Sequence, residues 1–211
     1  TSLIQLGLFS NFYQASSSEM FGLHTKEKLD EDSTFNPNSP YAEAKLENHK
    51  KVAVLSKKYD WNIYSGIMFN HESQFREDRY LFMKLINGAI DIKNKRLNKL
   101  TVGSLEYVRD WSYAGDISKA IYAITNNGIS NTYVIGSGKG NSIKTVIEII
   151  FDNFDLNLNK YIDIDETLIR KGDPVSIVSN PKKINNELSW YNNVSFEDLI
   201  QICIESKINK F

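Results

Sequence analysis

Apolar and polar positions along the chain alternate between two periods, one typical of strands and one typical of helices. Short apolar segments rich in β-forming residues predict strands, at residues 12–15, 61–69, 100–102, 107–108, 131–135 and 161–164. Longer segments with a helical period predict helices, at residues 1–8, 40–58, 80–92, 111–126 and 142–154, with a last helix from residue 195. Strands and helices that alternate in this way indicate an α/β protein.

Local signals at the helix starts support these boundaries. Ser39 is a natural N-cap residue, and Pro40 suits the first helical position because its missing N–H needs no partner there. Ser195 and Asp198 have the spacing of a capping box at the start of the last helix. Polar stretches between the elements predict loops or turns, at residues 16–38, 70–79 and 136–140.

The composition narrows the class of protein. The chain has 211 residues, enough for one sizeable core or for a core and a small second domain. Its 25 Lys and Arg nearly balance its 26 Asp and Glu, so neither nucleic acid nor an anionic membrane is an expected partner. Cys203 is the only cysteine, which excludes an intrachain disulfide. We see no signal-peptide layout and no apolar run of membrane-spanning length, and therefore expect a soluble, cytoplasmic protein.

Tyr41 and Lys45 form a candidate catalytic pair. They are four positions apart in a predicted helix, so both side chains lie on one face, about one turn apart. Deprotonating a free tyrosine at neutral pH costs roughly 4 kcal/mol, and a nearby ammonium group lowers that cost. The pair therefore has the chemistry of a general base for a sugar hydroxyl. An isolated Y-x-x-x-K spacing also fits an ordinary surface tyrosine and lysine.

Polar residues follow the first two long predicted strands. Ser17 and Glu19 come after the first strand, within the run Tyr13–Gly22, and Asn70 and His71 follow the second. Such groups would lie at the carboxyl edge of a parallel sheet, where open α/β folds bind ligands. The alternatives are a serine-rich loop with a solvated glutamate, and a histidine with an ordinary structural role.

Arg109 is a candidate anion-binding residue. It precedes Asp110 and Trp111, and an arginine beside a buried aromatic residue is well placed to fix its guanidinium for a phosphate. The same three residues also fit a charged turn next to a core indole.

Together these segments resemble the extended short-chain dehydrogenase/reductases, and among them the GDP-mannose 4,6-dehydratase family. The matching segments occur in family order and at family-like spacing, at Tyr13–Gly22, Ser39–Leu46, Gly66–Ser73 and Arg109–Trp111. The run F-N-H-E-S in the third segment is much more specific than Y-x-x-x-K. The likeness covers nearly the whole chain and fades after about Asn141.

The resemblance implies a fold and a division of the chain. The fold would be the C-terminal part of a Rossmann-type doubly wound parallel sheet, with a small α/β substrate-binding domain. Residues 1–75 and 109–138 would belong to the dinucleotide-binding domain, and residues 76–108 and 139–211 to the nucleotide-sugar-binding domain. Family members usually form dimers or tetramers, so a homo-oligomer is expected for the full-length protein.

The resemblance also implies a reaction, the conversion of GDP-mannose to GDP-4-keto-6-deoxymannose. Tyr41 would take the proton of the C4 hydroxyl as hydride leaves C4 for NADP, while Lys45 would hold the nicotinamide ribose and stabilise the tyrosinate. Ser17, where the family usually has threonine, would donate a hydrogen bond to the substrate. Glu19 would remove the C5 proton, made acidic by the C4 ketone, and would help water leave C6. The hydride would then return to C6.

Further residues match family positions that contact the cofactor. His71 and Arg76, together with Tyr41 and Lys45, would contact NADP. Phe75 stands where the family has the first of two adjacent arginines, so part of that contact is expected to differ.

Another group of residues matches positions that contact the nucleotide-sugar. Asn70, Lys84 and Arg109 would bind it, largely through its phosphates. Arg170 would belong to the same group, although the alignment near it is loose.

Some expected or tempting motifs are missing. No G-x-G-x-x-G follows a predicted strand, although a dinucleotide-binding fold begins with that turn, so by analogy roughly a hundred or more residues would precede this chain. We therefore expect this polypeptide alone to bind NADP poorly. Gly136–Ser142 lacks the spacing of a phosphate-binding loop, and we interpret it as a turn and a helix cap. His24, His49 and Cys203 are too scattered to predict a metal site.

Other functions fit parts of the same pattern. The chain could act on a different GDP-sugar as a dehydratase, or be an epimerase or reductase of the same superfamily. It could also be a non-catalytic fragment that lacks the glycine motif. Glu19 favours a dehydratase, because epimerases and reductases need no acid or base at C5 and C6.

Overall fold

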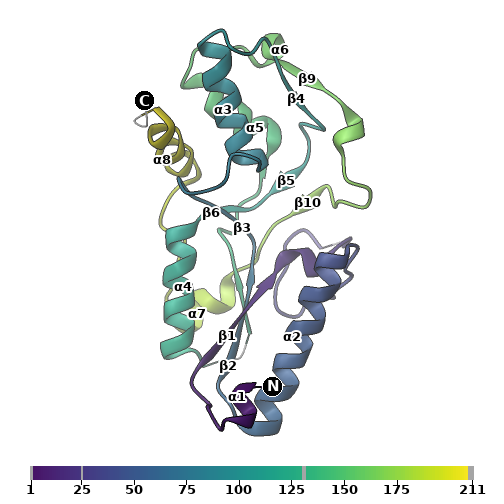
Figure 1. Cartoon of the computed structure of the whole chain (residues 1–211), viewed down its shortest axis with the longest axis vertical. Coiled ribbons are helices and arrows are strands. Elements are labelled where there is room, and N and C mark those ends of the chain that lie inside the picture. The colour runs from purple at the N-terminus through teal and green to yellow at the C-terminus, as the bar shows by residue number, and fades with distance from the viewer. Residues whose placement is uncertain (1, 25, 130–131, 209–211) are drawn as a thin grey trace.

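The computed structural model describes residues 2–24, 26–129 and 132–208; Thr1 and Asn131, which begin predicted elements, lie outside these ranges. The molecule is elongated, with a parallel sheet and its flanking helices in the lower half of Figure 1 and a mainly helical part above them. The expected α/β class is therefore confirmed. The division of the chain into two domains stays a prediction.

The central sheet is parallel throughout. Its strands lie in the order β1-β2-β7, with bounds β1 (Phe12–Ser17), β2 (Ile63–Met68) and β7 (Thr132–Ile135). The register places Ala15 beside Gly66, and Gly66 beside Tyr133. All three strands therefore end at the same edge, and the segments that follow β1 and β2 meet there.

Strand β1 continues two residues further than the sequence pattern predicts. Ser16 and Ser17 are polar, yet both still pair with β2, so the strand is longer than expected. Pairing with the neighbouring strand maintains the extended backbone where the side chains no longer indicate it. The loop predicted over residues 16–38 is also interrupted by the 3-10 helix η1 (Ser18–Phe21).

Helices cover both faces of the central sheet (Figure 1). The short helix α1 (Ser2–Gln5) precedes β1, and α2 (Pro40–Tyr59) packs against β1 on one face. Helices α4 (Ala114–Asn127) and α7 (Lys182–Leu188) lie on the other face. Helix α2 begins where the sequence predicts, because the Oγ of Ser39 accepts a hydrogen bond of 3.1 Å from the first turn.

Short strand pairs lie outside the central sheet. The paired strands are β3 (Asn70–Glu72) with β6 (Trp111–Tyr113), β4 (Leu100–Val102) with β9 (Ile162–Ile164), and β5 (Val108–Arg109) with β10 (Ser176–Ile177) and β8 (Asn141–Ser142). These pairs are parallel, except that β5 and β8 are antiparallel.

Two secondary-structure predictions are wrong at β3 and β6. The sequence pattern predicts a loop over residues 70–79 and a helix from Trp111, but Asn70–Glu72 and Trp111–Tyr113 form a parallel pair. The helix begins only at Ala114. Strands this short carry no readable period, and pairing between distant segments overrides the local pattern.

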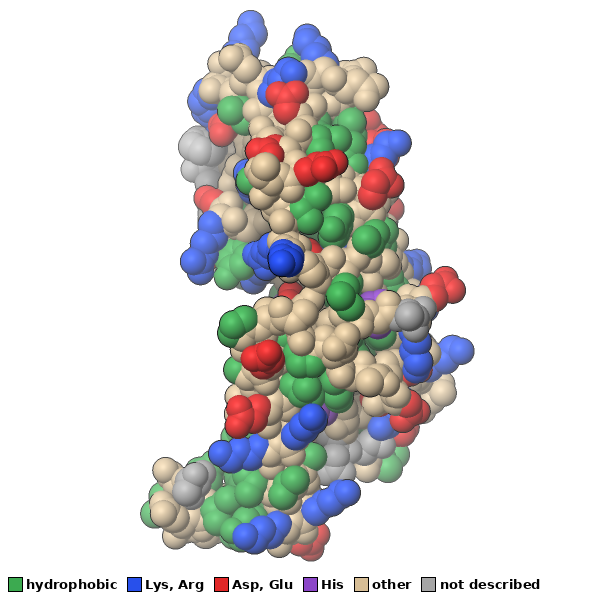
Figure 2. Space-filling model, turned by 90° about the vertical axis from the view of Figure 1, so that its right-hand side faces the viewer, with side chains coloured by type: hydrophobic (Ala, Val, Ile, Leu, Met, Phe, Trp, Pro, Cys, Tyr) green, Lys and Arg blue, Asp and Glu red, His purple; other side chains and the backbone are tan. Residues whose placement is uncertain are grey.

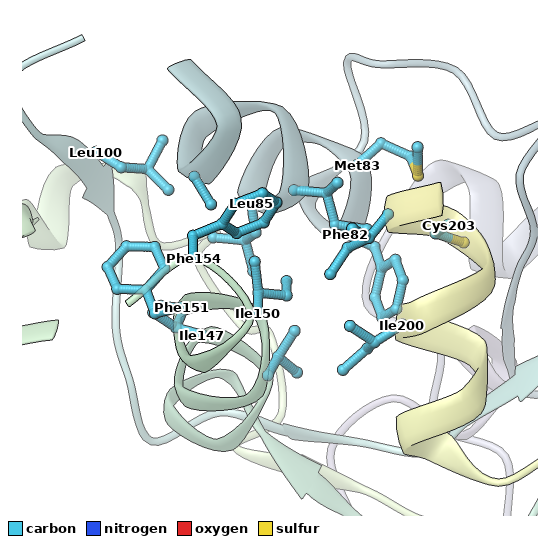
Figure 3. Packing of buried hydrophobic residues seen from close by; sticks show 14 of the residues in the cluster. Phe82, Met83, Leu85, Leu100, Ile147, Ile150, Phe151, Phe154, Ile200 and Cys203 are labelled. Carbon is cyan, nitrogen blue, oxygen red and sulfur yellow. The ribbon is translucent and has the colours of Figure 1, made fainter. Parts of the chain in front are cut away.

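The upper part has its own apolar core (Figure 3). Helices α3 (Leu81–Lys93), α5 (Ile143–Asp152) and α8 (Phe196–Ile208) surround it. Two short helical elements, α6 (Leu158–Tyr161) and η2 (Glu166–Leu168), lie between α5 and α7 in the sequence. Phe82 and Leu85 of α3, Ile147 and Ile150 of α5 and Ile200 of α8 face one another. Within the described ranges, no helix combines the length and apolar character needed to cross a bilayer.

The start of α8 confirms the predicted cap. The Oγ of Ser195 accepts a hydrogen bond of 3.0 Å from the N–H of Asp198 and donates one of 2.7 Å to the Asp198 carboxylate. The acid thus bonds the serine hydroxyl, whereas in a full capping box it would bond the backbone N–H of the cap residue.

A buried carboxylate holds the turn at residues 136–140. Asp110, with 0% exposure, accepts hydrogen bonds from the N–H and Oγ of Ser137 (2.9 and 2.5 Å), the N–H of Gly138 (3.0 Å), and the N–H and Oγ of Ser179 (3.1 and 2.5 Å). The glycine-rich run is therefore a structural turn, as interpreted, and Ser142 caps α5.

Candidate active site

A cleft lies where the parallel strands end, and it consists of two adjoining cavities. The Tyr41 cavity, about 690 Å³, is formed by the ends of β1 and β2, the start of α2, and β3. The Lys84 cavity, about 480 Å³, extends along α3 and the segments at 101–109 and 168–173. Every predicted site residue lines one cavity or both. In Figure 2 the outline narrows between the lower and upper parts, and Lys and Arg side chains gather above the narrowing.

Tyr41 and Lys45 lie together at the start of α2, in the Tyr41 cavity. The Nζ of Lys45 is 5.6 Å from the ring centroid of Tyr41 and donates a hydrogen bond of 3.0 Å to the carbonyl oxygen of Ala15 in β1. Lys45 thereby ties α2 to the end of the strand. The ammonium group stands beside the phenol, as the general-base hypothesis requires.

Ser17 and Glu19 enter the same cavity from the end of β1. The Oγ of Ser17 accepts a hydrogen bond of 3.2 Å from the N–H of Glu19 and caps η1. Gly22 ends this turn with a φ of 54°, and a Cβ there would lie 1.7 Å from the carbonyl oxygen of Asn36. Only glycine fits this close approach, which fixes the path of the chain behind Glu19.

A second hydrogen bond joins α2 to β1 next to the Lys45 contact. The Oγ of Ser16 and the Nδ1 of His49 are 2.9 Å apart, and His49 lies one turn after Lys45 on the helix. Burial lowers the pKa of His49, and the charge of Lys50 adds to this effect, so the neutral imidazole is favoured. The two bonds together fix the segment of Ser17 relative to Tyr41.

Asn70 and His71 lie in β3 and line the Tyr41 cavity. The Nδ1 of His71 is 2.9 Å from the carbonyl oxygen of Phe69. A carbonyl oxygen can only accept, so Nδ1 carries the proton and Nε2 is left as an acceptor in the neutral ring. This hydrogen bond fixes the orientation of the imidazole at the cavity wall.

Glu72 is the buried acid of the cleft. It is only 5% exposed, and its Oε2 lies 3.1 Å from the Nε of Arg76. Burial raises the pKa of Glu72 to about 7, while the charge of Arg76 opposes that rise. The Cζ of Arg76 is also 3.5 Å from the ring centroid of Tyr80. The guanidinium therefore contacts both a carboxylate and an aromatic ring.

Arg109 lines the Lys84 cavity, and neighbouring residues hold its side chain in place. Its side chain is 13% exposed, and its Nη2 donates a hydrogen bond of 2.7 Å to Asp173 Oδ1. The Tyr107 ring centroid lies 5.4 Å from its Cζ. Lys84 and Arg170 are exposed at the same cavity.

Positive charge exceeds negative charge around the Lys84 cavity. The basic side chains that line it are Arg76, Arg79, Lys84, Arg109 and Arg170, and the acidic ones are Glu19, Glu72 and Asp173. Such a balance favours an anionic ligand with phosphate groups.

Sequence reasoning missed three residues of this cleft. Glu72 stands inside the specific F-N-H-E-S run, which could have pointed to it. The four-residue spacing of Glu72 and Tyr80 from Arg76 would predict contact only within a helix, and Arg76 lies between β3 and α3. Asp173 carries no such signal, because its contact with Arg109 joins residues that are distant in the sequence.

Solved structures define the class of fold. The chain is similar to the structure of RMD from Pseudomonas aeruginosa complexed with NADPH, with a TM-score of 0.90 and 18% identity, over 100% of this chain and 70% of that one. It is also similar to a dTDP-glucose 4,6-dehydratase from Bacillus anthracis in complex with NAD, with a TM-score of 0.87 and 21% identity, over 99% and 64% of the two chains. The fold is that of Rossmann-type short-chain dehydrogenase/reductases.

Sequence comparison then identifies the family within this class. A model of the GDP-mannose 4,6 dehydratase family matches residues 4–203. The chain is 30% identical to GDP-mannose 4,6 dehydratase 2 of Arabidopsis thaliana over 97% of its length and 55% of the relative's. It is 25% identical to the Homo sapiens enzyme over 93% and 58% of the two lengths. The chain belongs to the GDP-mannose 4,6-dehydratase family, and it spans somewhat more than half the length of these relatives.

Proposed function

We propose that the complete protein converts GDP-mannose to GDP-4-keto-6-deoxymannose. The observation that carries this proposal is the meeting of Ser17, Glu19, Tyr41 and Lys45 in one cavity at the carboxyl edge of the sheet. A simple epimerase or reductase needs no acid/base group at C5 and C6, whereas a dehydratase does. Glu19 supplies that group. Membership of the family supports the same reaction.

A nicotinamide dinucleotide fits the Tyr41 cavity. Its volume of about 690 Å³ lies within the usual range for ligand sites. Lys45 and Arg76 offer donors for ribose hydroxyls and phosphates, and His71 Nε2 offers an acceptor for a hydroxyl. The buried Nε of Arg76 makes no hydrogen bond among the described residues. When bound, this group would accept a hydride from C4 and return it to C6. We assign NADP from the family resemblance, and complexes of structural neighbours with NADPH or NAD support the class.

Tyr41 and Lys45 carry the proton transfer at C4. The phenolate of Tyr41, which the nearby ammonium of Lys45 stabilises, takes the proton of the C4 hydroxyl and becomes the neutral phenol. The bond from Lys45 to Ala15 keeps the ammonium in place during this step. Ser17 donates a hydrogen bond to the same region of the sugar.

Glu19 carries the elimination. A ketone at C4 makes the C5 proton acidic because the anion that forms is an enolate. The Glu19 carboxylate removes this proton and then, as the acid, protonates the C6 hydroxyl so that it leaves as water. The exposed position of Glu19 in the cavity leaves its carboxylate free to reach the sugar.

Residues of the Lys84 cavity hold the nucleotide end of the substrate. Arg109 is fixed by Asp173, so its guanidinium loses little freedom on binding a phosphate. Lys84 and Arg170 add positive charge, and Asn70 offers an amide where the two cavities join. These contacts place the hexose beside Tyr41.

The product of the complete protein tests this proposal. We expect incubation with GDP-mannose and NADP+ to give a nucleotide-sugar with a C6 methyl group and a C4 ketone, seen by NMR. A product that keeps the C6 hydroxyl, or an unchanged substrate, would contradict the proposal. A homo-oligomer remains a prediction from the family resemblance. A cytoplasmic location remains a prediction from the sequence pattern and the single cysteine.

A further inference from the structure

Glu72 has no part in the reaction as proposed, yet it lies on the wall that the two cavities share. It is the last residue of β3, in register with Tyr113 of β6. Strand β6 pairs with its backbone, and only 6% of its side chain is exposed to solvent. A carboxyl group so placed needs a partner.

The partner of Glu72 is Arg76. Glu72 Oε2 and Arg76 Nε are 3.1 Å apart, and both atoms are buried, but their alignment falls short of a hydrogen bond. Tyr80 packs against the same guanidinium, 3.5 Å from its Cζ to the ring centroid. Arg76 thus keeps a defined position by charge attraction and stacking, with its hydrogen-bonding capacity at Nε unused.

Other charged groups line the two cavities whose shared wall holds this pair, and Cys203 of α8 interacts with Glu72. The cations are Lys45, Arg79, Lys84, Arg109, Arg170 and Lys171, and the acids are Glu19 and Asp173. On α8, burial raises the pKa of the Cys203 thiol to about 12, and Glu72 adds to this effect while Lys207 opposes it. The thiol stays neutral near physiological pH, so it does not exchange protons with Glu72 there.

We propose that Glu72 is a positioning residue for Arg76 and that it takes up a proton from solvent when a phosphate group of a ligand binds this arginine. In the free protein the ionised carboxylate holds the guanidinium. A bound phosphate brings a second negative charge to the same guanidinium, and the uptake of one proton by Glu72 removes the repulsion between the two anions.

The electrostatics of the site place the proton uptake by Glu72 near neutral pH. Burial already raises the pKa of Glu72 to about 7 in the free protein, and Arg76 is the charge that opposes this rise. A phosphate bound to Arg76 offsets the positive charge that lowers the pKa of Glu72, so the pKa of Glu72 rises further when the ligand binds. Protons are therefore taken up, most strongly just above neutral pH.

The proposal rests on the proposed function for the identity of the ligand, but its test does not. We would titrate the complete protein separately with NADP+, with GDP-mannose and with inorganic sulfate, an anion that does not titrate near neutral pH. Calorimetry in buffers of different ionisation enthalpy measures the proton uptake. Infrared difference spectra show whether the carbonyl band of a protonated carboxyl group appears. The two nucleotide arms tell which ligand's phosphate reaches Arg76.

Glu72→Gln is the decisive variant, and Glu77→Gln is its matched control because Glu77 is exposed and pairs with Arg79. We expect the carboxyl band and the extra proton uptake in the parent and in Glu77→Gln, and their loss in Glu72→Gln and in Arg76→Gln. Equal uptake in the parent and in folded Glu72→Gln would overturn the proposal. So would a parent protein that binds at least one of the three anions but shows a carboxyl band with none of them. If neither NADP+ nor GDP-mannose binds, the proposed function fails. The titration with sulfate still tests whether Glu72 takes up a proton when an anion binds Arg76.

Discussion

Lys45 reaches from α2 to β1, where its Nζ donates a hydrogen bond of 3.0 Å to the Ala15 carbonyl oxygen while lying 5.6 Å from the ring centroid of Tyr41. This single side chain therefore connects the helix that carries the phenol to the strand that leads into Ser17 and Glu19. The position of Tyr41, the proposed general base, relative to Glu19 depends on this contact and on the neighbouring Ser16–His49 bond.

Tyr41→Phe removes the proposed general base without changing the shape of the ring. We expect kcat to fall by about 10²–10⁴-fold with little change in the affinity for GDP-mannose, because general-base catalysis contributes on this scale. Steady-state kinetics of the complete protein would measure both. Tyr59→Phe, on the same helix but outside the cleft, is the control and should keep normal kcat. Comparable losses in both variants would point to a damaged helix rather than to a lost base.

Glu19→Gln keeps the size of the side chain but removes its charge. We expect the formation of 6-deoxy product to fall by about 10²-fold or more, since the C5 proton then lacks its base. Product analysis by NMR and circular dichroism of the fold would be compared with those of Glu27→Gln, an exposed position away from the cleft. Full activity in Glu19→Gln would remove this residue from the mechanism.

Arg109→Lys tests the fixed guanidinium of the Lys84 cavity. Lysine keeps the charge but cannot reproduce the fork that bonds both Asp173 and a phosphate oxygen. We expect GDP-mannose to bind about tenfold more weakly, equivalent to about 1.4 kcal/mol, as measured by calorimetry. Arg96→Lys, an exposed pair with Asp91, serves as the control and should bind normally. Unchanged affinity in Arg109→Lys would exclude the assignment of Arg109.

Asp110→Ala should destabilise the fold strongly. Its buried carboxylate accepts hydrogen bonds from Ser137, Gly138 and Ser179, and the substitution removes the acceptor that these donors share. We expect a loss of about 3 kcal/mol or more in the free energy of unfolding, from denaturant titrations. Asp163→Ala removes an exposed ion pair with Lys99 and should cost less than about 1 kcal/mol. Similar losses in the two variants would contradict this account of the turn.

Glu72→Gln should change how stability depends on pH. The pKa of Glu72 is raised from 4.5 to about 7 in the folded protein, so the folded state holds this proton more tightly than the unfolded state. The resulting stability is fully present below about pH 4.5 and is lost as the pH rises through about 7. Relative to the parent, Glu72→Gln should gain about 3 kcal/mol over this window. Urea titrations across the window would measure it, and Glu77→Gln should show no such gain.

Much of the fold was predictable because its signals are local. Ser39 and Pro40 mark the start of α2, and the continuous apolar run before Asn70 marks a buried strand. The convergence of Glu19 with Tyr41 also followed, because the ends of parallel strands share one edge.

Features that depend on contacts between distant segments were not predictable. The short strands β3 and β6 exist because each pairs with the other, so Trp111 begins a strand where its sequence suggests a helix. Helix α7 was missed because its sequence is mostly polar and Ile184 is its only buried residue among those described. The burial of Glu72 likewise comes from packing between β3 and its surroundings, which no local spacing shows.

The fate of a label at C4 tests the central claim most directly. GDP-mannose deuterated at C4 would be incubated with the complete protein and NADP+, and the product would be analysed by NMR and mass spectrometry. We expect deuterium in the C6 methyl group of a 4-keto product, because the hydrogen removed from C4 returns to C6. Deuterium that stays at C4, or a product that keeps its C6 hydroxyl, would contradict it.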